Sequence, residues 1–112
     1  MVSEDSVFRA IAHPARRSIL RLLASSARSV KELTSEFEMS QPAISQHLKE
    51  LKEANLVASE RCGLERRYHL TPAPLRHVLK WSDQYRSLID PAGHFWTLAA
   101  ARQEKVKPKR NS

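Results

Sequence analysis

Polar side chains that can donate and accept hydrogen bonds recur at helical spacing in the stretch SQPAISQHLKEL, residues 40–51. They are Ser40, Gln41, Ser45, Gln46 and Lys49. A glutamine can bond the N6 and N7 atoms of an adenine, a serine can donate or accept, and a lysine can reach a phosphate or a guanine. The same side chains also suit simple solvation of an exposed helix face, so the residue types alone leave both interpretations open.

A helical wheel separates these side chains from a narrow apolar seam. At about 100° per residue, Ile44, Leu48 and Leu51 fall within about 60° of one another. The polar residues, together with Pro42 in the first turn, fall outside that sector. We therefore expect the seam to face the core and the polar residues to face away from it. Ser40 and the first backbone N–H groups can also hold a phosphate, because the positive end of the helix dipole lies there.

Capping signals predict four helices in the first half of the chain. Ser3 is suited to cap the first helix, and Pro14 suits the first position of the second. Ser29, followed three residues later by a glutamate, fits a capping box at the start of a third helix. After a tight turn at residues 38–39, Ser40 caps the fourth. A short helix, a tight turn and a helix with a polar outer face form a helix-turn-helix, a unit that reads DNA.

The period of the apolar residues changes from about 3.6 to 2 beyond residue 55, which predicts two strands, 57–62 and 66–70, joined at Gly63. Tyr68 and Leu70 alternate with polar residues, so one face of this hairpin can pack inward. Three arginines flank the loop: Arg61, Arg66 and Arg67. A positive tip of this kind meets phosphate or a narrow minor groove. The alternative is an arginine-rich edge that discourages sheet aggregation.

The remaining third of the chain is expected to be helical, with a single helix over residues 75–89, a break at 90–93 and a shorter helix over 94–103. The predicted fold class is mainly α with a small β-hairpin. We expect one domain over residues 1–103 and a basic, disordered tail over 104–112, which lacks the apolar residues needed for a core.

The chain carries a formal net charge of +7 and a sequence pI of about 10.1. Such a balance suits a polyanionic partner, either a nucleic acid or a membrane surface. Residues 102–112 hold five basic residues against one acidic residue, a net +4, so more than half of the excess lies near the C-terminus. The charge alone therefore says little about the folded part, and we interpret the tail mainly as solubilising.

Other features of the sequence restrict the function classes. Cys62 is the only cysteine, which excludes an intramolecular disulfide and fits a reducing compartment. No segment resembles a signal peptide or a membrane span, so we expect a cytoplasmic protein without membrane association. The sequence contains no glycine-rich phosphate loop, paired carboxylates or nucleophile motif, and we expect no enzyme activity.

Three consecutive segments resemble the ArsR/SmtB family of bacterial winged helix-turn-helix repressors. They are FRAIAHPARRSILRLLA (8–24), SVKELTSEFEMSQPAISQHLKELKEANLV (29–57) and ERCGLERRYHLTP (60–72). The resemblance implies a homodimer that binds an imperfect palindrome in a double-stranded DNA operator. The contact positions that it implies are Gln41, Pro42, Ser45 and Gln46. The wing departs from the family pattern, since Leu64 and Glu65 precede Arg66 where the family often has Gly-Arg.

The resemblance also implies that apolar residues of the first and last helices form a two-fold interface. These residues are Val7, Phe8, Ile11, Leu79, Trp81, Tyr85, Leu88 and Ile89. Their other possible role is ordinary intramolecular core, and we expect some of them to serve it.

Metal-sensing members of the family use a cysteine pair on the first helix of the helix-turn-helix, before the recognition helix that reads DNA. Others use an aspartate and histidine set on the last long helix. The helix expected over residues 30–37 contains neither Cys nor His, and the last helix offers only His77 and Asp83, with His94 beyond it. Because zinc needs about four converging ligands, we expect no metal and no cofactor, and we assign no effector. We interpret Cys62 as an inert wing cysteine, since a redox role would need an intermolecular bond or a sulfenic acid.

The leading hypothesis is a dimeric DNA-binding repressor that covers promoter DNA and excludes polymerase. Two alternatives remain open: a winged-helix module that docks a protein partner, and a metal- or thiol-responsive sensor.

Overall fold

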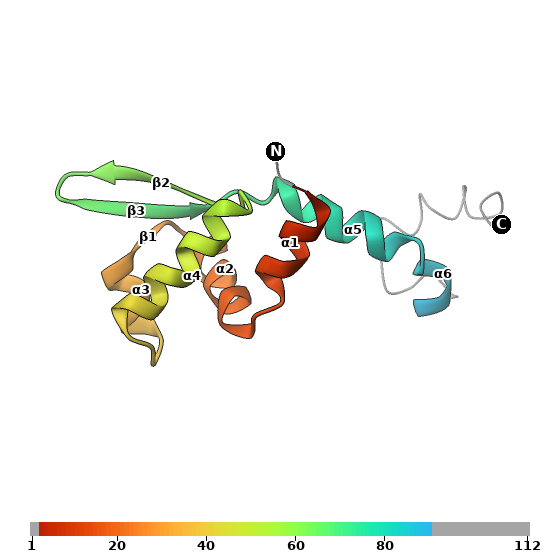
Figure 1. Ribbon diagram of the computed structural model, residues 1–112, viewed down its shortest axis with the longest axis horizontal. Coiled ribbons are helices and arrows are strands. Elements are labelled where there is room, and N and C mark those ends of the chain that lie inside the picture. The colour runs from red at the N-terminus through yellow and green to blue at the C-terminus, as the bar shows by residue number, and fades with distance from the viewer. Residues whose placement is uncertain (1–2, 91–112) are drawn as a thin grey trace. The chain divides into compact units, whose positions relative to one another are not determined.

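The computed structural model describes residues 3–90, which form a winged helix-turn-helix followed by short C-terminal helices (Figure 1). The chain divides into two compact units at residues 78 and 79, and each is described by itself. The first unit begins with α1 (Glu4–Ile11), α2 (Pro14–Ser25), β1 (Arg28–Ser29), α3 (Val30–Glu36) and α4 (Gln41–Glu53). It continues with β2 (Val57–Cys62), β3 (Glu65–Leu70) and a 3-10 turn, η1 (Ala73–Leu75). Two further helices, α5 (Arg76–Asp83) and α6 (Arg86–Ile89), end the described residues. The predicted fold class is confirmed.

The four predicted helix starts are confirmed. The hydroxyl of Ser3 accepts from the Ser6 N–H at 3.1 Å, and Pro14 occupies the first turn of α2. At α3 the capping box is complete, because Ser29 accepts from the Glu32 N–H at 3.1 Å and the Glu32 carboxylate accepts from the Ser29 N–H at 3.0 Å. These local bonds satisfy N–H groups that the helices leave unpaired, which sets where each helix begins.

The apolar seam of α4 lies at the centre of the core, as the helical wheel predicts. Ile44, Leu48 and Leu51 are 0%, 1% and 0% exposed. They pack with other buried residues of the first unit, among them Ile19, Leu23, Leu33 and Leu56. Burying each of these side chains contributes about 1.5–3 kcal/mol, so the seam fixes which face of α4 remains at the surface.

The end of α4 turns the chain into the hairpin. The Leu56 N–H donates to Leu51 O at 3.0 Å and the Asn55 N–H donates to Lys52 O at 2.9 Å. Asn55 has a φ of 59°, the left-handed conformation that this type of helix end requires. Leu56 is fully buried next to it, so the turn is anchored in the core.

The wing is a hairpin of β2 and β3, and β3 also pairs with β1, so the antiparallel sheet has the order β1-β3-β2. The prediction of two strands missed β1, because a two-residue strand is too short to show an alternating pattern. The second strand begins at Glu65, one residue before the predicted start, and pairs with Cys62. The loop therefore consists of Gly63 and Leu64 alone, and Gly63 takes a φ of 68°, as the first position of this type of loop demands.

The predicted single helix over residues 75–89 is wrong, because α5 ends at Asp83 and α6 begins at Arg86. The Ser82 hydroxyl donates to Leu79 O at 3.2 Å, and the Tyr85 N–H donates to Ser82 O at 3.0 Å, three residues back instead of four. A serine that bonds back to the preceding turn competes with the helix ladder and promotes such a break. The predicted break at 90–93 lies almost wholly outside the described residues, and the helix over 94–103 and the tail over 104–112 lie wholly outside them.

Candidate nucleic-acid interface

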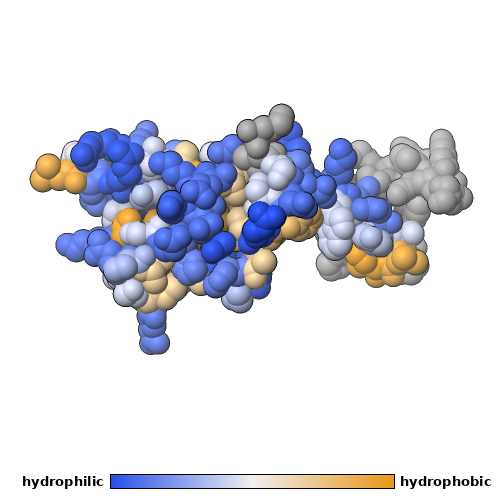
Figure 2. All heavy atoms as spheres, viewed as in Figure 1, coloured by the Kyte–Doolittle hydropathy of each residue, from blue (hydrophilic) through white to orange (hydrophobic). Residues whose placement is uncertain are grey.

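A polar stripe runs along the surface of α4, beside the buried seam. Gln41, Ser45, Lys49 and Lys52 are all exposed. Their spacing of four, four and three residues places them on one side of the helix, within about 80° on the wheel. Figure 2 shows that the visible face of the first unit is mostly hydrophilic. This stripe presents hydrogen-bonding and cationic groups of the kinds that bind nucleobase edges and phosphates.

Gln46 differs from the stripe residues, although it is exposed as predicted. Its side-chain Nε2 donates to a carboxylate oxygen of Glu50 at 3.0 Å, one helical turn further along. To bond a base, the amide would have to leave this carboxylate. The structure thus brings Gln41, Ser45 and Lys49 together on one side and holds Gln46 on another.

The start of α4 offers less to an anion than its position suggests. Pro42 has no N–H, and the N–H of Ala43 donates to the Ser40 hydroxyl at 3.2 Å. The Ile44 N–H donates to Ser40 O at 3.1 Å. Among the described residues of this first turn, the Gln41 N–H is the group left for a phosphate. The side chain of Ser40 acts as a helix cap, which is its principal role in this structure.

The three wing arginines fall into two groups. Arg61 and Arg66 are exposed and face each other directly across β2 and β3. Arg67 lies one residue further along, so the alternation of the strand directs it to the opposite face. Its guanidinium donates to Ala27 O at 2.8 Å and forms an ion pair with Glu32 at 3.0 Å. The structure therefore brings Arg61 and Arg66 together and separates Arg67 from them.

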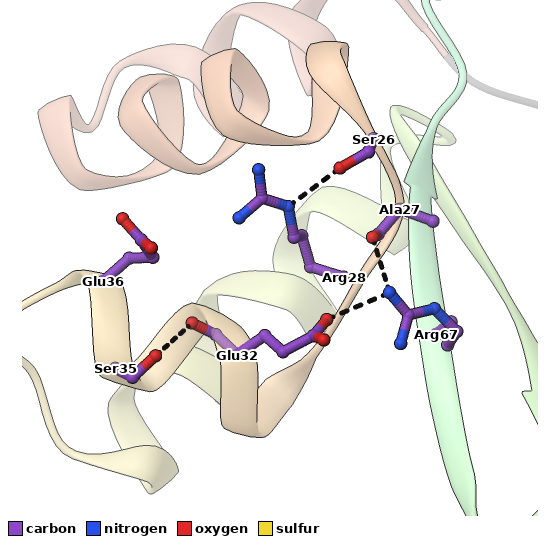
Figure 3. A pocket seen from close by; sticks show the side chains of 7 residues that line it. All are labelled: Ser26, Ala27, Arg28, Glu32, Ser35, Glu36 and Arg67. Atoms are coloured by element: carbon purple, nitrogen blue, oxygen red, sulfur yellow. Dashed lines mark hydrogen bonds and ion pairs between the residues drawn. The ribbon is translucent and has the colours of Figure 1, made fainter.

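Arg67 and Glu32 form one wall of an open polar cavity of about 390 Å³ (Figure 3). Arg28 lies across the cavity, where its Nε donates to the Ser26 hydroxyl at 3.1 Å. The hydrogen bond from the Ser29 N–H lowers the pKa of Glu32, and the charge of Arg67 lowers it further. These contacts favour the ionised form of Glu32 and connect β3 to the start of the helix-turn-helix.

A second polar cluster, unforeseen from the sequence, holds α4 against the first two helices. Arg16 Nε donates to His47 Nδ1 at 3.2 Å, and another nitrogen of Arg16 donates to Ala10 O at 3.4 Å. The neighbouring Arg17 donates to Ile11 O at 2.7 Å. The His13 and His47 rings lie 5.1 Å apart between centroids. The only signal in the sequence was the His-Pro-x-Arg opening of the second helix, which gives no indication of its partner 31 residues away.

This cluster makes the stability of the fold depend on pH. Burial lowers the pKa of His47 below its ordinary value of 6.5, and the charges of Arg16 and His13 lower it further. Below about pH 6.5 the unfolded chain therefore binds a proton at His47 more readily than the folded chain does, and the free energy of unfolding falls as the pH falls. We expect urea unfolding midpoints to decrease from pH 7.5 to pH 5.5 by more in the native chain than in His47→Gln. His77→Gln is the matched control, and it should behave like the native chain; equal pH slopes in the native chain and His47→Gln would contradict the prediction.

The apolar residues predicted for a two-fold interface divide between the core and the surface. Val7 is fully buried, so its place in an interface is wrong: it belongs to the intramolecular core, together with Ala10. Phe8 and Ile11 are partly buried, and Ile11 packs against that core. In the second unit, by contrast, large apolar side chains are exposed, and Figure 2 shows a hydrophobic patch over α6. They are Leu79 at 60%, Trp81 at 46%, Tyr85 at 42%, Leu88 at 79% and Ile89 at 52%.

Residues 3–90 contain no group of three or more His, Cys, Asp or Glu side chains placed to hold a metal ion. None of the helices in that range is long and apolar enough to cross a membrane. Cys62 is a free thiol exposed near the wing tip.

Comparison with known proteins assigns this geometry to a family. The model of the arsR family of bacterial regulatory proteins matches residues 13–59. The chain is similar to the HTH-type transcriptional regulator Rv2034 of Mycobacterium tuberculosis, with 37% identity over 99 residues that span 81% of this chain and 92% of that protein. It is also similar to the transcriptional repressor SdpR of Bacillus subtilis, with 35% identity over 77 residues, 69% of this chain and 86% of that protein.

Among solved structures, an ArsR-like transcriptional regulator from Rhodococcus sp. RHA1 matches with a TM-score of 0.66 at 30% identity, over 89% of this chain and 90% of that chain. The matched residues 13–59 contain the whole helix-turn-helix, including the polar stripe of α4. Sequence, fold and surface thus agree that this chain belongs to the arsR family of bacterial regulatory proteins, which are DNA-binding regulators of transcription and not enzymes.

Proposed function

We propose that this protein is a repressor that binds a palindromic DNA operator as a homodimer. The observation that carries the proposal is the contrast between the two faces of α4. The seam at Ile44, Leu48 and Leu51 is buried, while Gln41 and Ser45 are exposed on the helix that a helix-turn-helix places in the major groove. Gln41 lies in the first turn, where residues of such a helix reach base edges.

Exposed apolar side chains in the second unit support a dimer. Leu79, Leu88 and Ile89 are more than half exposed, and a small domain gains stability when such residues are covered by a partner. A two-fold axis would place two α4 helices about 34–36 Å apart, one turn of DNA, and each would read one half of a palindrome. Repression then follows from occupancy, because a protein that covers promoter DNA excludes polymerase. Such a target places the protein in the cytoplasm.

A gel shift with the DNA upstream of the protein's own gene tests the proposal. We expect a single shifted band at protein concentrations where a random duplex of equal length stays free. A palindrome within that region should be protected from nuclease, and a single half-site should bind much more weakly than the whole. Equal affinity for the upstream region and the random duplex, or equal affinity for the half-site and the whole site, would contradict it.

A further inference from the structure

Two cationic side chains from different elements meet at one neutral hydroxyl. Lys52 Nζ, at the end of α4, donates to the Ser59 hydroxyl oxygen at 3.3 Å. A nitrogen of Arg66, on β3, donates to the same oxygen at 3.2 Å. The two nitrogens are therefore no more than about 6.5 Å apart, the sum of these two lengths, and their like charges repel each other. A serine dipole alone compensates this repulsion only weakly.

The register of the hairpin adds a third cation to the same face. Arg61 lies directly opposite Arg66, and Ser59 lies two residues before Arg61 on the same side of β2. Like charges opposite each other on a sheet oppose pairing of the strands. Among residues 3–90 the ion pairs are Arg67–Glu32 and Arg86–Asp83, and neither neutralises this group. Lys52 and Arg66 thus form an exposed positive cluster at the Ser59 hydroxyl, and Arg61 lies on the same face of the hairpin, opposite Arg66.

We propose that this cluster is a clamp for one phosphodiester of the DNA backbone, held jointly by the end of the recognition helix and by the wing. The Ser59 oxygen accepts from both cations, so its own proton is free to be donated to a phosphate oxygen. An anion placed there accepts hydrogen bonds from Lys52, Arg66 and the Ser59 hydroxyl. Its negative charge also reduces the repulsion between Lys52 and Arg66. Inorganic phosphate shares this chemistry, but the surroundings favour DNA.

The position of Lys52 is the reason to choose DNA as the source of the phosphate. Lys52 lies on the same side of α4 as Gln41 and Ser45, the pair proposed to read bases. The stripe therefore leads from the start of α4 to the clamp at its end. A helix bound in the major groove by its first turn places its later turns near the flanking backbone. The clamp rests on the proposed DNA-binding function and adds two residues, Lys52 and Ser59, to the arginines expected from the wing.

Fluorescence anisotropy with a random 30-base-pair duplex tests the clamp, because a phosphate contact does not depend on sequence. Lys52→Gln, Arg66→Gln and the double variant that carries both changes are compared with Arg21→Gln, an exposed cation on α2 whose loss equals the charge change of each single variant. If both cations hold one phosphate, the double variant should reduce the slope of log K against log salt by about 0.9 per protomer. Two separate phosphates would reduce it by about 1.8. At 0.1 M salt the loss of one contact corresponds to roughly eightfold weaker binding per protomer.

Ser59→Ala separates the hydroxyl from the charges. We expect weaker duplex binding with an unchanged salt slope, since both cations remain. Thermal unfolding of the Lys52 and Arg66 variants should occur at no lower a temperature than that of Arg21→Gln, because these side chains are exposed and their replacement removes like-charge repulsion.

Three outcomes would overturn the clamp. A double variant that behaves like Arg21→Gln would show that no phosphate is bound there, and a slope reduction of about 1.8 would show separate contacts. Inorganic phosphate that raises the melting temperature of the native chain but not of the double variant, with duplex binding unchanged, would assign the site to the free ion. Failure of the native chain to bind any duplex would instead overturn the proposed function itself.

Discussion

Replacing both Gln41 and Ser45 by alanine is expected to remove most of the discrimination between operator and random DNA. Both side chains are exposed on the stripe of α4, next to an apolar seam that is buried in the core. A well-placed glutamine–adenine pair contributes about 1–3 kcal/mol of discrimination. In a symmetric dimer that contribution occurs twice, so the ratio of the two dissociation constants should fall by roughly 30-fold to 10⁴-fold.

The measurement compares dissociation constants for the operator fragment and a random duplex at one salt concentration. Gln84→Ala with Ser87→Ala is the matched control, since both residues are exposed and lie in the second unit. The control should leave the ratio unchanged. Gln46→Ala should have a smaller effect than Gln41→Ala, because the Gln46 amide already donates to Glu50. If operator and random affinities fall by the same factor in the double variant, the assignment of Gln41 and Ser45 as base-reading residues is wrong.

The second large effect is expected from a charge in the exposed apolar surface of the second unit. Leu88 is 79% exposed and Leu79 is 60% exposed. If each is buried against a second copy, Leu79→Glu with Leu88→Glu removes two leucine contacts per protomer, and covering each leucine contributes about 1.5–3 kcal/mol. The monomer–dimer dissociation constant should rise by at least roughly 10³-fold, and operator affinity should fall to that of a half-site.

Sedimentation equilibrium measures the association directly, and circular dichroism checks that the variant remains folded. Leu64→Glu provides the matched control, because Leu64 is fully exposed in the loop between β2 and β3. It should remain a dimer. A double variant that sediments like the native chain would rule out this surface as the interface.

The parts of the fold that depend on neighbours in sequence were predictable. Ser29 and Ser40 mark helix starts because a cap bonds an N–H three residues away, and the seam of α4 follows from helical periodicity alone. The break after Asp83 was not predicted, because the leucines and aromatic residues of this stretch favour a continuous helix. The helix is interrupted by the Ser82 hydroxyl, which bonds Leu79 O, and by a backbone bond from Tyr85 to Ser82 that spans three residues instead of four. Val7 was assigned to an interface because periodicity identifies an apolar face without saying what covers it.

The candidate site was predictable only where the residue type and its position on the helical wheel determine whether a side chain is exposed. Exposure of Gln41, Pro42, Ser45 and Lys49 follows from the helical wheel, and their contact with DNA stays a prediction. The opposite faces of Arg66 and Arg67 follow from strand alternation, whereas the bond from Arg67 to Glu32, which lies 35 residues earlier in the chain, does not. The meeting of Lys52 with Arg66 likewise depends on how the hairpin folds back on α4, and no local pattern encodes it.

The Arg16 guanidinium links three helices, because Arg16 lies on α2 and donates hydrogen bonds to α1 and α4. The group is attached to α2, donates to the last turn of α1 through Ala10 O, and holds α4 through His47. A displacement at the end of α1 must therefore carry the recognition helix with it, or break a hydrogen bond worth about 0.5–1.5 kcal/mol. The guanidinium therefore couples the position of α1 to that of α4, the helix proposed to bind DNA.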